Sequence, residues 1–217
     1  MSFYQVFDFL GDLNKNNNKA WMEANRNRYQ DVRQFILDWI EHLGQRLQKI
    51  DPDYVLTPPK KAISRINNNL IYQPNAPIYR DYFGAEMSKA KEKGMFYVQM
   101  GLHDSFIGGG FYNPSKDVLD SIRAAIDYNG EALKRIIRHE SFANTFGELN
   151  DKNALKTVPK GYARDHQHAD LLRLKSFAVM RTITRQEIMA DDFTDQVVKV
   201  YQAMRPFNHY LEKAVSV

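Results

Sequence analysis

The order in which the hydrophobic repeat changes along the chain is the feature that most limits its fold. Apolar residues recur every three or four positions in residues 2–13 and 19–49, which predicts a short helix and then a long amphipathic helix. Strand-like segments follow within residues 62–112, and helical repeats return from Pro114 onward and continue to the segment 193–214. Helices, then strands, then helices again are typical of an α+β protein and not of alternating βαβ units.

The middle of the chain predicts a mostly antiparallel sheet, packed by the N-terminal and C-terminal helices. The expected strands are residues 62–66, 82–87, 95–102, 105–112 and 176–182. Strands 95–102 and 105–112 are expected to form a hairpin that turns at His103-Asp104, a pair that would suit a general base but needs no such role in a turn. Glycines 108–110 suggest a bulge, or a point where another group approaches the backbone closely.

The length and composition are those of one ordinary globular domain. A chain of 217 residues can bury a substantial core, and its 43% hydrophobic and 26% charged residues show no bias toward disorder. The sequence contains no internal repeat and no flexible linker, so we expect a single α+β domain over residues 1–217.

The expected location is the cytoplasm. The chain has no cysteine, which excludes disulfides, thiolate metal sites and a cysteine nucleophile and fits a reducing compartment. The first residues, MSFYQVFDFLGDL, lack the basic start of a secretory signal, and no run of about 18 apolar residues occurs. We therefore expect neither export nor a membrane partner.

A basic strip runs from Lys152 to Arg185. It holds eight Lys or Arg against two Asp, a local excess of +6, whereas the whole chain has a net charge of +4. Such a strip can face phosphates or other anions. Its alternative is an ordinary solvated surface that acids elsewhere balance in space.

The segment PKGYARDHQHADLLRLKSF (159–177) gathers most of the candidate site residues. Asp165, His166 and Asp170 are oxygen and nitrogen donors, and His166 and His168 would share a face only in an extended backbone. The alternative is a loop histidine that caps a helix or binds a carbonyl, with Asp165 as the N-cap of the next helix. We expect no metal and no cofactor here.

Charged residues of the same segment offer an anion site. Asp170 could hold Arg173 so that its guanidinium presents donors to an anion, with Lys175 beside it. The alternative is a surface ion pair between Asp170 and Arg173 that stabilises one helical turn by a few tenths of a kcal/mol.

A second candidate group flanks the Asn- and Pro-rich loop of residues 67–78. Arg65 lies between apolar neighbours of an expected strand and needs either water or a partner. Tyr79 could belong to an aromatic wall beside Arg65, and the other members of that wall would be Tyr72, Tyr82 and Phe83. The alternative is that these aromatics are core residues with polar tips.

Common catalytic patterns do not occur. The sequence lacks GxxxxGK[ST], GxGxxG, HExxH, GxSxG and EF-hand spacing, so the glycines at 108–110 are not a phosphate-binding loop. This lowers the odds of a familiar nucleotide-binding or hydrolase class, although a site assembled from distant residues is still open.

Three blocks of the chain resemble a known family. FLGDLNKNNNKAWMEANRNRY (9–29), SFIGGGFYNPSKDVLDSIRAAIDYN (105–129) and VPKGYARDHQHADLLRLKSF (158–177) are similar, in order and spacing, to the bacterial conserved hypothetical proteins of the domain of unknown function 2461. The resemblance covers nearly the whole chain and implies no activity. In the third block Asp165, His166, Asp170, Arg173 and Lys175 match the family pattern. His168 replaces a small residue.

The resemblance also identifies a charged block that this chain alters. The family pattern RxxRDxRFxx[DN]KxxY matches Arg65, Asn75 and Tyr79, and Tyr72 stands where Phe is usual. Four charged positions are replaced, by Asn68, Asn69, Ile71 and Ala76. If the block binds an anion in relatives, charge-assisted bonds would here be neutral bonds of roughly half the strength.

Three hypotheses follow from these residues, and binding is favoured over catalysis, so whether the protein is an enzyme is left open. In the first, Arg65 and Tyr79 meet residues 165–175 and form a polar, basic pocket for an anionic small molecule. In the second, the basic strip 152–185 binds nucleic acid or a protein partner, with salt-dependent affinity. In the third, the chain is a regulatory or scaffold domain without a chemical site.

Overall fold

The structure of the protein is a computed structural model that describes residues 1–88, 90, 93–149 and 152–215. The chain divides into two compact units. The first unit comprises Met1–Lys89, Tyr97–Ile107 and Thr182–Val198, and the second comprises Ala90–Phe96, Gly108–Arg181 and Lys199–Val217.

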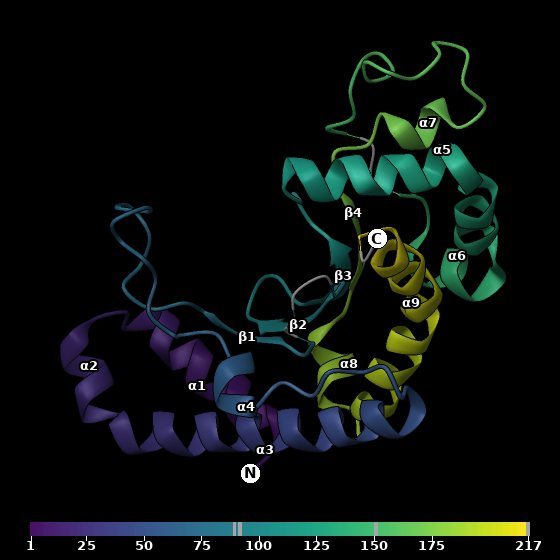
Figure 1. Ribbon diagram of the computed structural model, residues 1–217. Coiled ribbons are helices and arrows are strands. Elements are labelled where there is room, and N and C mark those ends of the chain that lie inside the picture. The colour runs from purple at the N-terminus through teal and green to yellow at the C-terminus, as the bar shows by residue number, and fades with distance from the viewer. Residues whose placement is uncertain (89, 91–92, 150–151, 216–217) are drawn as a thin grey trace. The chain divides into compact units, whose positions relative to one another are not determined.

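The chain begins with helices, continues with strands and then returns mainly to helices, as Figure 1 shows. In chain order the elements are α1 (Phe3–Lys15), α2 (Lys19–Ala24), α3 (Arg26–Ile50), α4 (Pro59–Ala62), β1 (Tyr82–Glu86), β2 (Met95–Gly101), β3 (Phe106–Phe111), α5 (Lys116–Arg138), α6 (Glu140–Phe146), α7 (Ala169–Leu172), β4 (Phe177–Thr182), α8 (Arg185–Met189) and α9 (Phe193–Val215).

The strands form one four-stranded antiparallel sheet that is flanked by helices, in the order β1-β2-β3-β4. The register of the first pair places Tyr82 opposite Gly101 and Glu86 opposite Tyr97. The predicted α+β class and mostly antiparallel sheet are therefore confirmed. The prediction of one domain over residues 1–217 stays a prediction. Within the described ranges, no helix has both the length and the apolar character that a membrane crossing needs.

The first helices of the first unit begin at side-chain caps. Ser2 and Gln5 form a capping box at α1, and the Asn18 side chain accepts a hydrogen bond of 2.9 Å from the backbone N–H of Trp21 in α2. The prediction of a single helix over residues 19–49 is wrong. Asn25, with φ −108° and ψ 18°, leaves the helical conformation and separates α2 from α3, and its side chain donates to the carbonyl of Trp21.

The loop between α4 and β1 forms an arm (residues 63–81). The predicted strand 62–66 is wrong, because Ala62 ends α4 and Ile63 pairs with Ala85 of β1 only in an isolated bridge. A second isolated bridge, between Asn67 and Tyr79, joins the two sides of the arm. The tip of the arm is exposed: Ile71 keeps 88% of its accessible surface and Tyr72 keeps 83%. The arm is visible in Figure 1 as a twisted loop beyond α1.

The second unit contains a kinked α5. Ser115, and not Pro114, caps this helix, and the chain leaves the helical conformation at Asn129 with φ −152° and ψ 57°. The Asn129 side chain accepts from the backbone N–H of Ala132, so it starts the second half of the helix as a cap would. The chain therefore kinks at Asn129 within α5.

Glycines of β3 accommodate close packing from within the unit. A side chain at Gly109 would overlap the sulfur of Met204 in α9 and the carbonyl of Met95. Gly110 has φ +99°, a conformation that favours glycine, and lies against the carbonyl of Phe177. The groups that approach the backbone of β3 closely are therefore residues of the protein, from α9 and the neighbouring strands β2 and β4.

Candidate functional site

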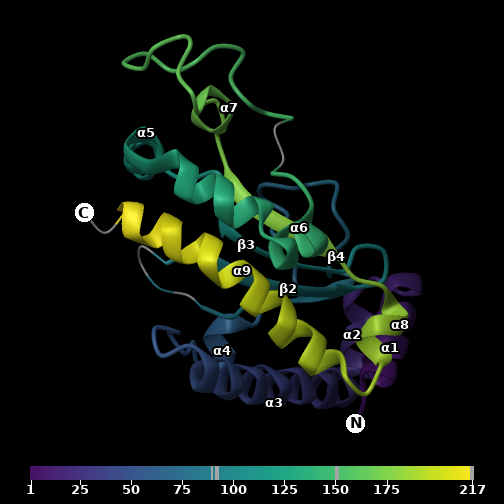
Figure 2. The same cartoon turned by 90° about the vertical axis from the view of Figure 1, so that its right-hand side faces the viewer.

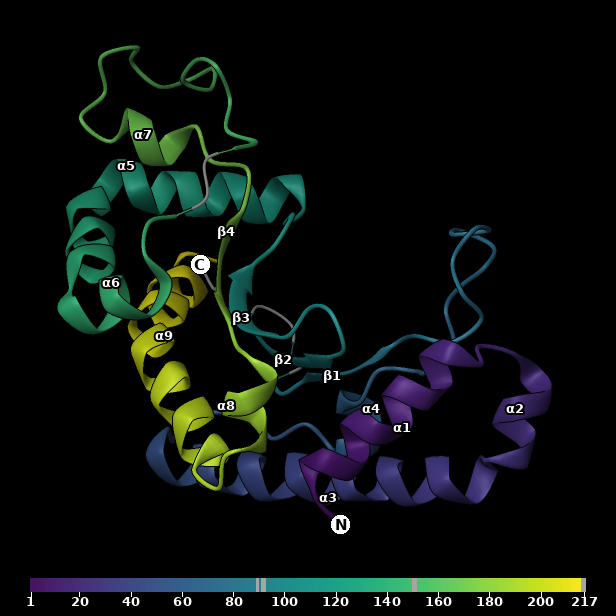
Figure 3. The ribbon, with the colours of Figure 1, turned by 180° about the vertical axis from the view of Figure 1, so that it is seen from behind.

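A polar face of α5 faces the loop that carries most of the sequence-predicted site residues. The face consists of Asp120, Arg123, Asp127, Gly130 and Lys134, which follow one another at steps of three and four residues and so share one side of a helix. We call it the α5 polar face. Figure 3 shows α7 lying along α5.

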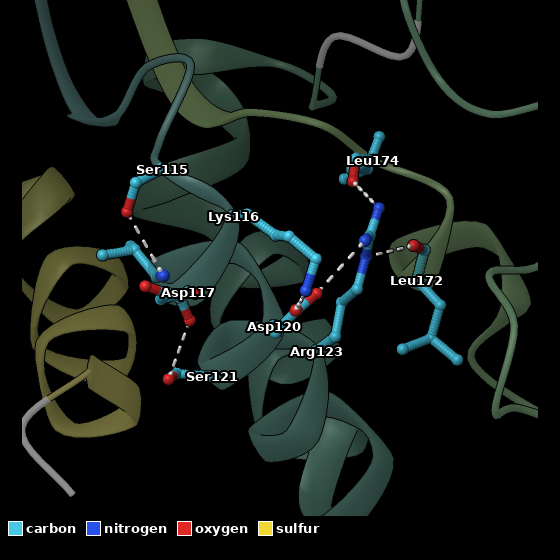
Figure 4. A network of polar contacts seen from close by, with 9 residues as sticks. Ser115, Lys116, Asp117, Asp120, Ser121, Arg123, Leu172 and Leu174 are labelled. Atoms are coloured by element: carbon cyan, nitrogen blue, oxygen red, sulfur yellow. Dashed lines mark hydrogen bonds and ion pairs between the residues drawn. The ribbon is translucent and has the colours of Figure 1, made fainter.

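Arg123 is the most buried charge of this face. Its side chain is close to fully buried, Nε donates to the carbonyl of Leu172 at 3.0 Å, and Nη2 donates to the carbonyl of Leu174 at 3.2 Å (Figure 4). Leu172 is the last residue of α7 and Leu174 lies two residues beyond it, where backbone acceptors lack helical partners. Burial lowers the pKa of Arg123, and the carboxylate of Asp120, 3.8 Å from Nη1, opposes that shift. Arg123 therefore fixes the end of α7.

His166 is held at both ring nitrogens. Nδ1 accepts the backbone N–H of His168 at 3.0 Å, and Nε2 lies 2.9 Å from Oδ1 of Asp127. An imidazole that accepts at Nδ1 carries its proton on Nε2, so His166 donates to Asp127. Neither nitrogen is available to a metal or a substrate without breaking a bond. His166 thus fastens the loop to α5 through the carboxylate of Asp127, a partner that neither reading of the sequence named.

Lys134 binds the same loop about two turns further along α5 than Asp127 does. Its ammonium lies 3.0 Å from Oδ1 of Asp170 and donates to the carbonyl of Gln167 at 3.2 Å. The expected pairing of Asp170 with Arg173 is therefore wrong, because the partner of Asp170 is Lys134. The cap prediction for Asp165 is also wrong, because His168 occupies the N-cap position of α7 and residues 163–169 turn and are not extended.

The remaining predicted residues of this loop have polar groups without a partner among the described residues. Asp165 and Lys175 are exposed, and the side chain of neither has an ion pair with any residue that the structure describes. Arg173 is half-buried, and its Nε has no hydrogen-bond partner in the described part of the chain. His168 is buried, and its Nδ1 is likewise without a partner there.

Arg65 and Tyr79 belong to the first unit. The ring of Tyr79 is buried, and its backbone N–H and carbonyl both bind the side-chain amide of Asn17 at 2.9 Å. The side chain of Arg65 is exposed and has no ion pair among the described residues. The meeting of these two residues with the loop 165–175, which lies in the second unit, stays a prediction.

The other sequence hypotheses about this unit have clear outcomes. The aromatic wall is wrong, because Tyr72 is exposed at the tip of the arm whereas Phe83 lies in the core. At the hairpin turn, the ring of His103 is largely exposed. Its Nε2 lies 3.7 Å from a carboxylate oxygen of Asp81, and not beside Asp104 as the sequence suggested. In the described ranges, no cluster of three or more His, Cys, Asp or Glu could hold a metal ion.

A groove in the second unit was not foreseen from the sequence. It has a volume of about 500 Å³ and is lined by Ala132, Arg135, Ile136, His139, Ser141, Phe142, Gln202, Ala203 and Pro206. Most of its wall is apolar, and Arg135 is exposed without an ion pair among the described residues. The sequence gives little signal for it, because Arg135 lies in the last turn of α5 and His139 follows the end of that helix.

His139 occupies a fixed position at the edge of this groove. It is the N-cap residue of α6, and its Nδ1 accepts the backbone N–H of Ser141 at 3.3 Å. In the described part of the chain, the hydroxyl of Ser141 has no histidine partner, so the groove holds no nucleophile and base in contact. It holds a cation, an imidazole and an apolar wall.

Comparison with known proteins identifies the chain by its family. Neither the search of curated proteins nor the search of solved structures found a match. The model of the conserved hypothetical proteins DUF2461 matches residues 5–210. This match spans most of the sequence, and the chain is therefore a member of the DUF2461 family of conserved hypothetical proteins.

Proposed function

We propose that the protein binds a small organic anion with an apolar body, and that the groove between α5, α6 and α9 in the second unit holds it. The observation that carries the proposal is the guanidinium of Arg135, which has no ion pair among the described residues and lies at a groove of about 500 Å³ whose wall is mainly apolar. Ligand sites of this volume typically combine apolar walls with a few polar groups that fix orientation.

The groove suits this ligand class better than the loop 165–175 does. His166 and Asp170 hold the loop on α5, through Asp127 and Lys134. Arg135 holds nothing in the described chain, so it is free to form charge-assisted hydrogen bonds with a carboxylate, sulfonate or phosphate. The apolar part of the ligand would pack on Ile136 and Phe142.

Binding is proposed, and not catalysis. A nucleophile needs a base within hydrogen-bond reach, and Ser141 contacts His139 through its backbone N–H. The proposal also places the protein in the bacterial cytoplasm, which agrees with the lack of cysteine.

A pair of fluorescent probes tests the proposal. 8-Anilinonaphthalene-1-sulfonate has an aromatic body and an anionic group, and N-phenyl-1-naphthylamine has nearly the same body without the charge. We expect Arg135→Gln to weaken binding of the sulfonate by roughly five- to tenfold, as loss of about 1–1.4 kcal/mol would do, and to leave the neutral probe unchanged.

The control variant is Arg138→Gln. Arg138 lies in the same turn of α5 but is absent from the groove wall, and it is 3.7 Å from Glu131. It should bind both probes as the wild type does. Ala132→Trp, which fills the groove, should weaken both probes. Equal sulfonate affinity in Arg135→Gln and wild type would overturn the proposal, as would an equal loss in Arg138→Gln.

The basic strip supports a second candidate, nucleic-acid binding. Lys156, Lys160, Arg164 and Lys175 are exposed, and within the described residues none of them forms an ion pair. Retention on DNA or RNA that falls steeply with salt would support this function, because phosphate contacts release counterions. Absence of retention at low salt would remove it.

A further inference from the structure

A second cavity lies in the first unit, among α1, α3 and the turn between α8 and α9. Its volume is about 490 Å³, close to that of the groove in the second unit. The side chains that matter for its chemistry are Phe3, Tyr4, Phe35, Asp191, Phe193 and Thr194. Figure 2 shows α8 beside α1, and these helices contact each other.

The wall of this cavity is built from rings in fixed contact. Phe3 meets Phe35 edge-on with centroids 5.1 Å apart, and meets Phe193 edge-on at 5.2 Å. Phe193 in turn stacks on Trp39 at 5.6 Å, and the indole N–H of Trp39 donates to the hydroxyl of Thr194. Each of these rings is thus held by a neighbour. Because the rings are already ordered, ligand binding would cost little side-chain entropy.

The charge at this cavity is negative, opposite to that of the groove. Asp191 lines it and is exposed, and no described residue forms an ion pair with it. The nearby acids are occupied: Asp192 accepts from the side chain of Gln196 at 2.8 Å, and Asp195 pairs with Arg46 at 2.6 Å. The lining residues include no Lys, Arg or His. Asp191 is therefore a carboxylate without a cation beside an aromatic wall.

We propose that this cavity binds an organic ammonium ion, either a quaternary ammonium or a protonated amine with an apolar substituent. The faces of aromatic rings carry negative potential and attract such cations, which lose less hydration than a metal ion does. The carboxylate of Asp191 supplies the opposite charge. Neutral molecules of the same shape gain only the apolar contact, and anions meet repulsion.

Three ligands of one shape class test the charge preference on the full chain by isothermal titration calorimetry. Benzyltrimethylammonium is the cationic probe, benzyl alcohol the neutral one and phenylacetate the anionic one. We expect saturable binding of the cation, at least fivefold weaker binding of the alcohol and no detectable binding of phenylacetate at this site. Equal affinity for the cation and the alcohol would overturn the proposal, and so would absence of cation binding.

Two pairs of variants locate the binding. Asp191→Asn should weaken the cation about fivefold, as loss of an exposed charge pair of ~1 kcal/mol would do, whereas Asp192→Asn should stay within twofold of wild type. Tyr4 keeps 63% of its surface exposed, so substitution there spares the core. Tyr4→Leu should weaken the cation about two- to fivefold, and Tyr4→Phe should retain it. An equal loss in Asp192→Asn, or none in Asp191→Asn, would place the cation elsewhere and overturn the assignment.

Discussion

The ring of His168 lies directly against the backbone of Gly130. A Cβ atom at Gly130 would be 2.5 Å from Cδ2 of the imidazole and 2.6 Å from Cγ, closer than real Cβ atoms approach other heavy atoms. Gly130 follows the kink of α5 at Asn129, and His168 begins α7. This contact sets how closely the loop before α7 can approach α5.

Gly130→Ala should therefore destabilise the protein. The added methyl must push the buried imidazole away or shift α5, and overpacking of this kind costs about 1–3 kcal/mol. Urea unfolding followed by circular dichroism measures the change as a lower midpoint with the same slope.

His168→Ala provides the control for that prediction, because it removes the atoms with which the methyl collides. In the His168→Ala background, Gly130→Ala should cost at most a few tenths of a kcal/mol, so the double-mutant cycle should show a coupling of about 1–2 kcal/mol. Additive costs of the two changes would mean that the contact does not limit the packing.

Arg123→Met should loosen the end of α7. The variant keeps the length of the side chain but leaves the carbonyls of Leu172 and Leu174 without their donor. Loss of bonds from a charged donor costs about 1.5–3 kcal/mol, and much of it should appear as local opening. Amide hydrogen exchange should quicken in residues 169–175.

Arg138→Met is the matched change for Arg123→Met. Arg138 is on the same helix, mostly exposed and 3.7 Å from Glu131, so it should shift stability by less than about 0.5 kcal/mol. If both variants opened the segment 169–175 to the same degree, the role of Arg123 would be disproved.

The sequence predicted the elements where local pattern decides the structure. The apolar repeat of α1 and α9 and the hairpin of β2 and β3 depend on neighbours within a few positions. It failed at Asn25, because the apolar repeat continues through the break and makes α2 and α3 resemble one helix. It also failed at residues 62–66, where pairing with β1 is confined to one isolated bridge, between Ile63 and Ala85.

The site was harder because its partners are distant in sequence. The charged character of His166 and Asp170 is visible locally, but their partners Asp127 and Lys134 lie 39 and 36 positions earlier and carry no local mark. The groove at Arg135 depends on how α9 packs beside α5 and α6, which no periodic pattern encodes. The sequence thus identified polar residues of the second unit that form long-range contacts, and it misassigned the groups that they contact.

Two glycine substitutions should have opposite signs. Gly11 lies within α1, and a Cβ there would meet nothing within 4 Å, so Gly11→Ala should stabilise the protein by about 0.5–1 kcal/mol. Gly109→Ala would drive a methyl into the sulfur of Met204 and the carbonyl of Met95, and it should destabilise by more than about 3 kcal/mol. Thermal unfolding of both variants measures the two shifts, and two shifts of the same sign would contradict the packing at β3.

Tyr210 should make stability depend on pH in the alkaline range. Burial raises the pKa of its phenol to about 12, and its hydroxyl donates to the carbonyl of Asn129 at 3.2 Å. In the unfolded chain the pKa of tyrosine is about 10, so the stability that the neutral phenol contributes is complete below pH 10 and is lost as the pH rises toward 12. Urea unfolding between pH 9 and pH 11 should show a steeper fall for the wild type than for Tyr210→Phe. Tyr128, with 91% of its surface exposed, is the control, and Tyr128→Phe should keep the slope of the wild type. If Tyr210→Phe kept that slope as well, the phenol at the kink would not be the titrating group.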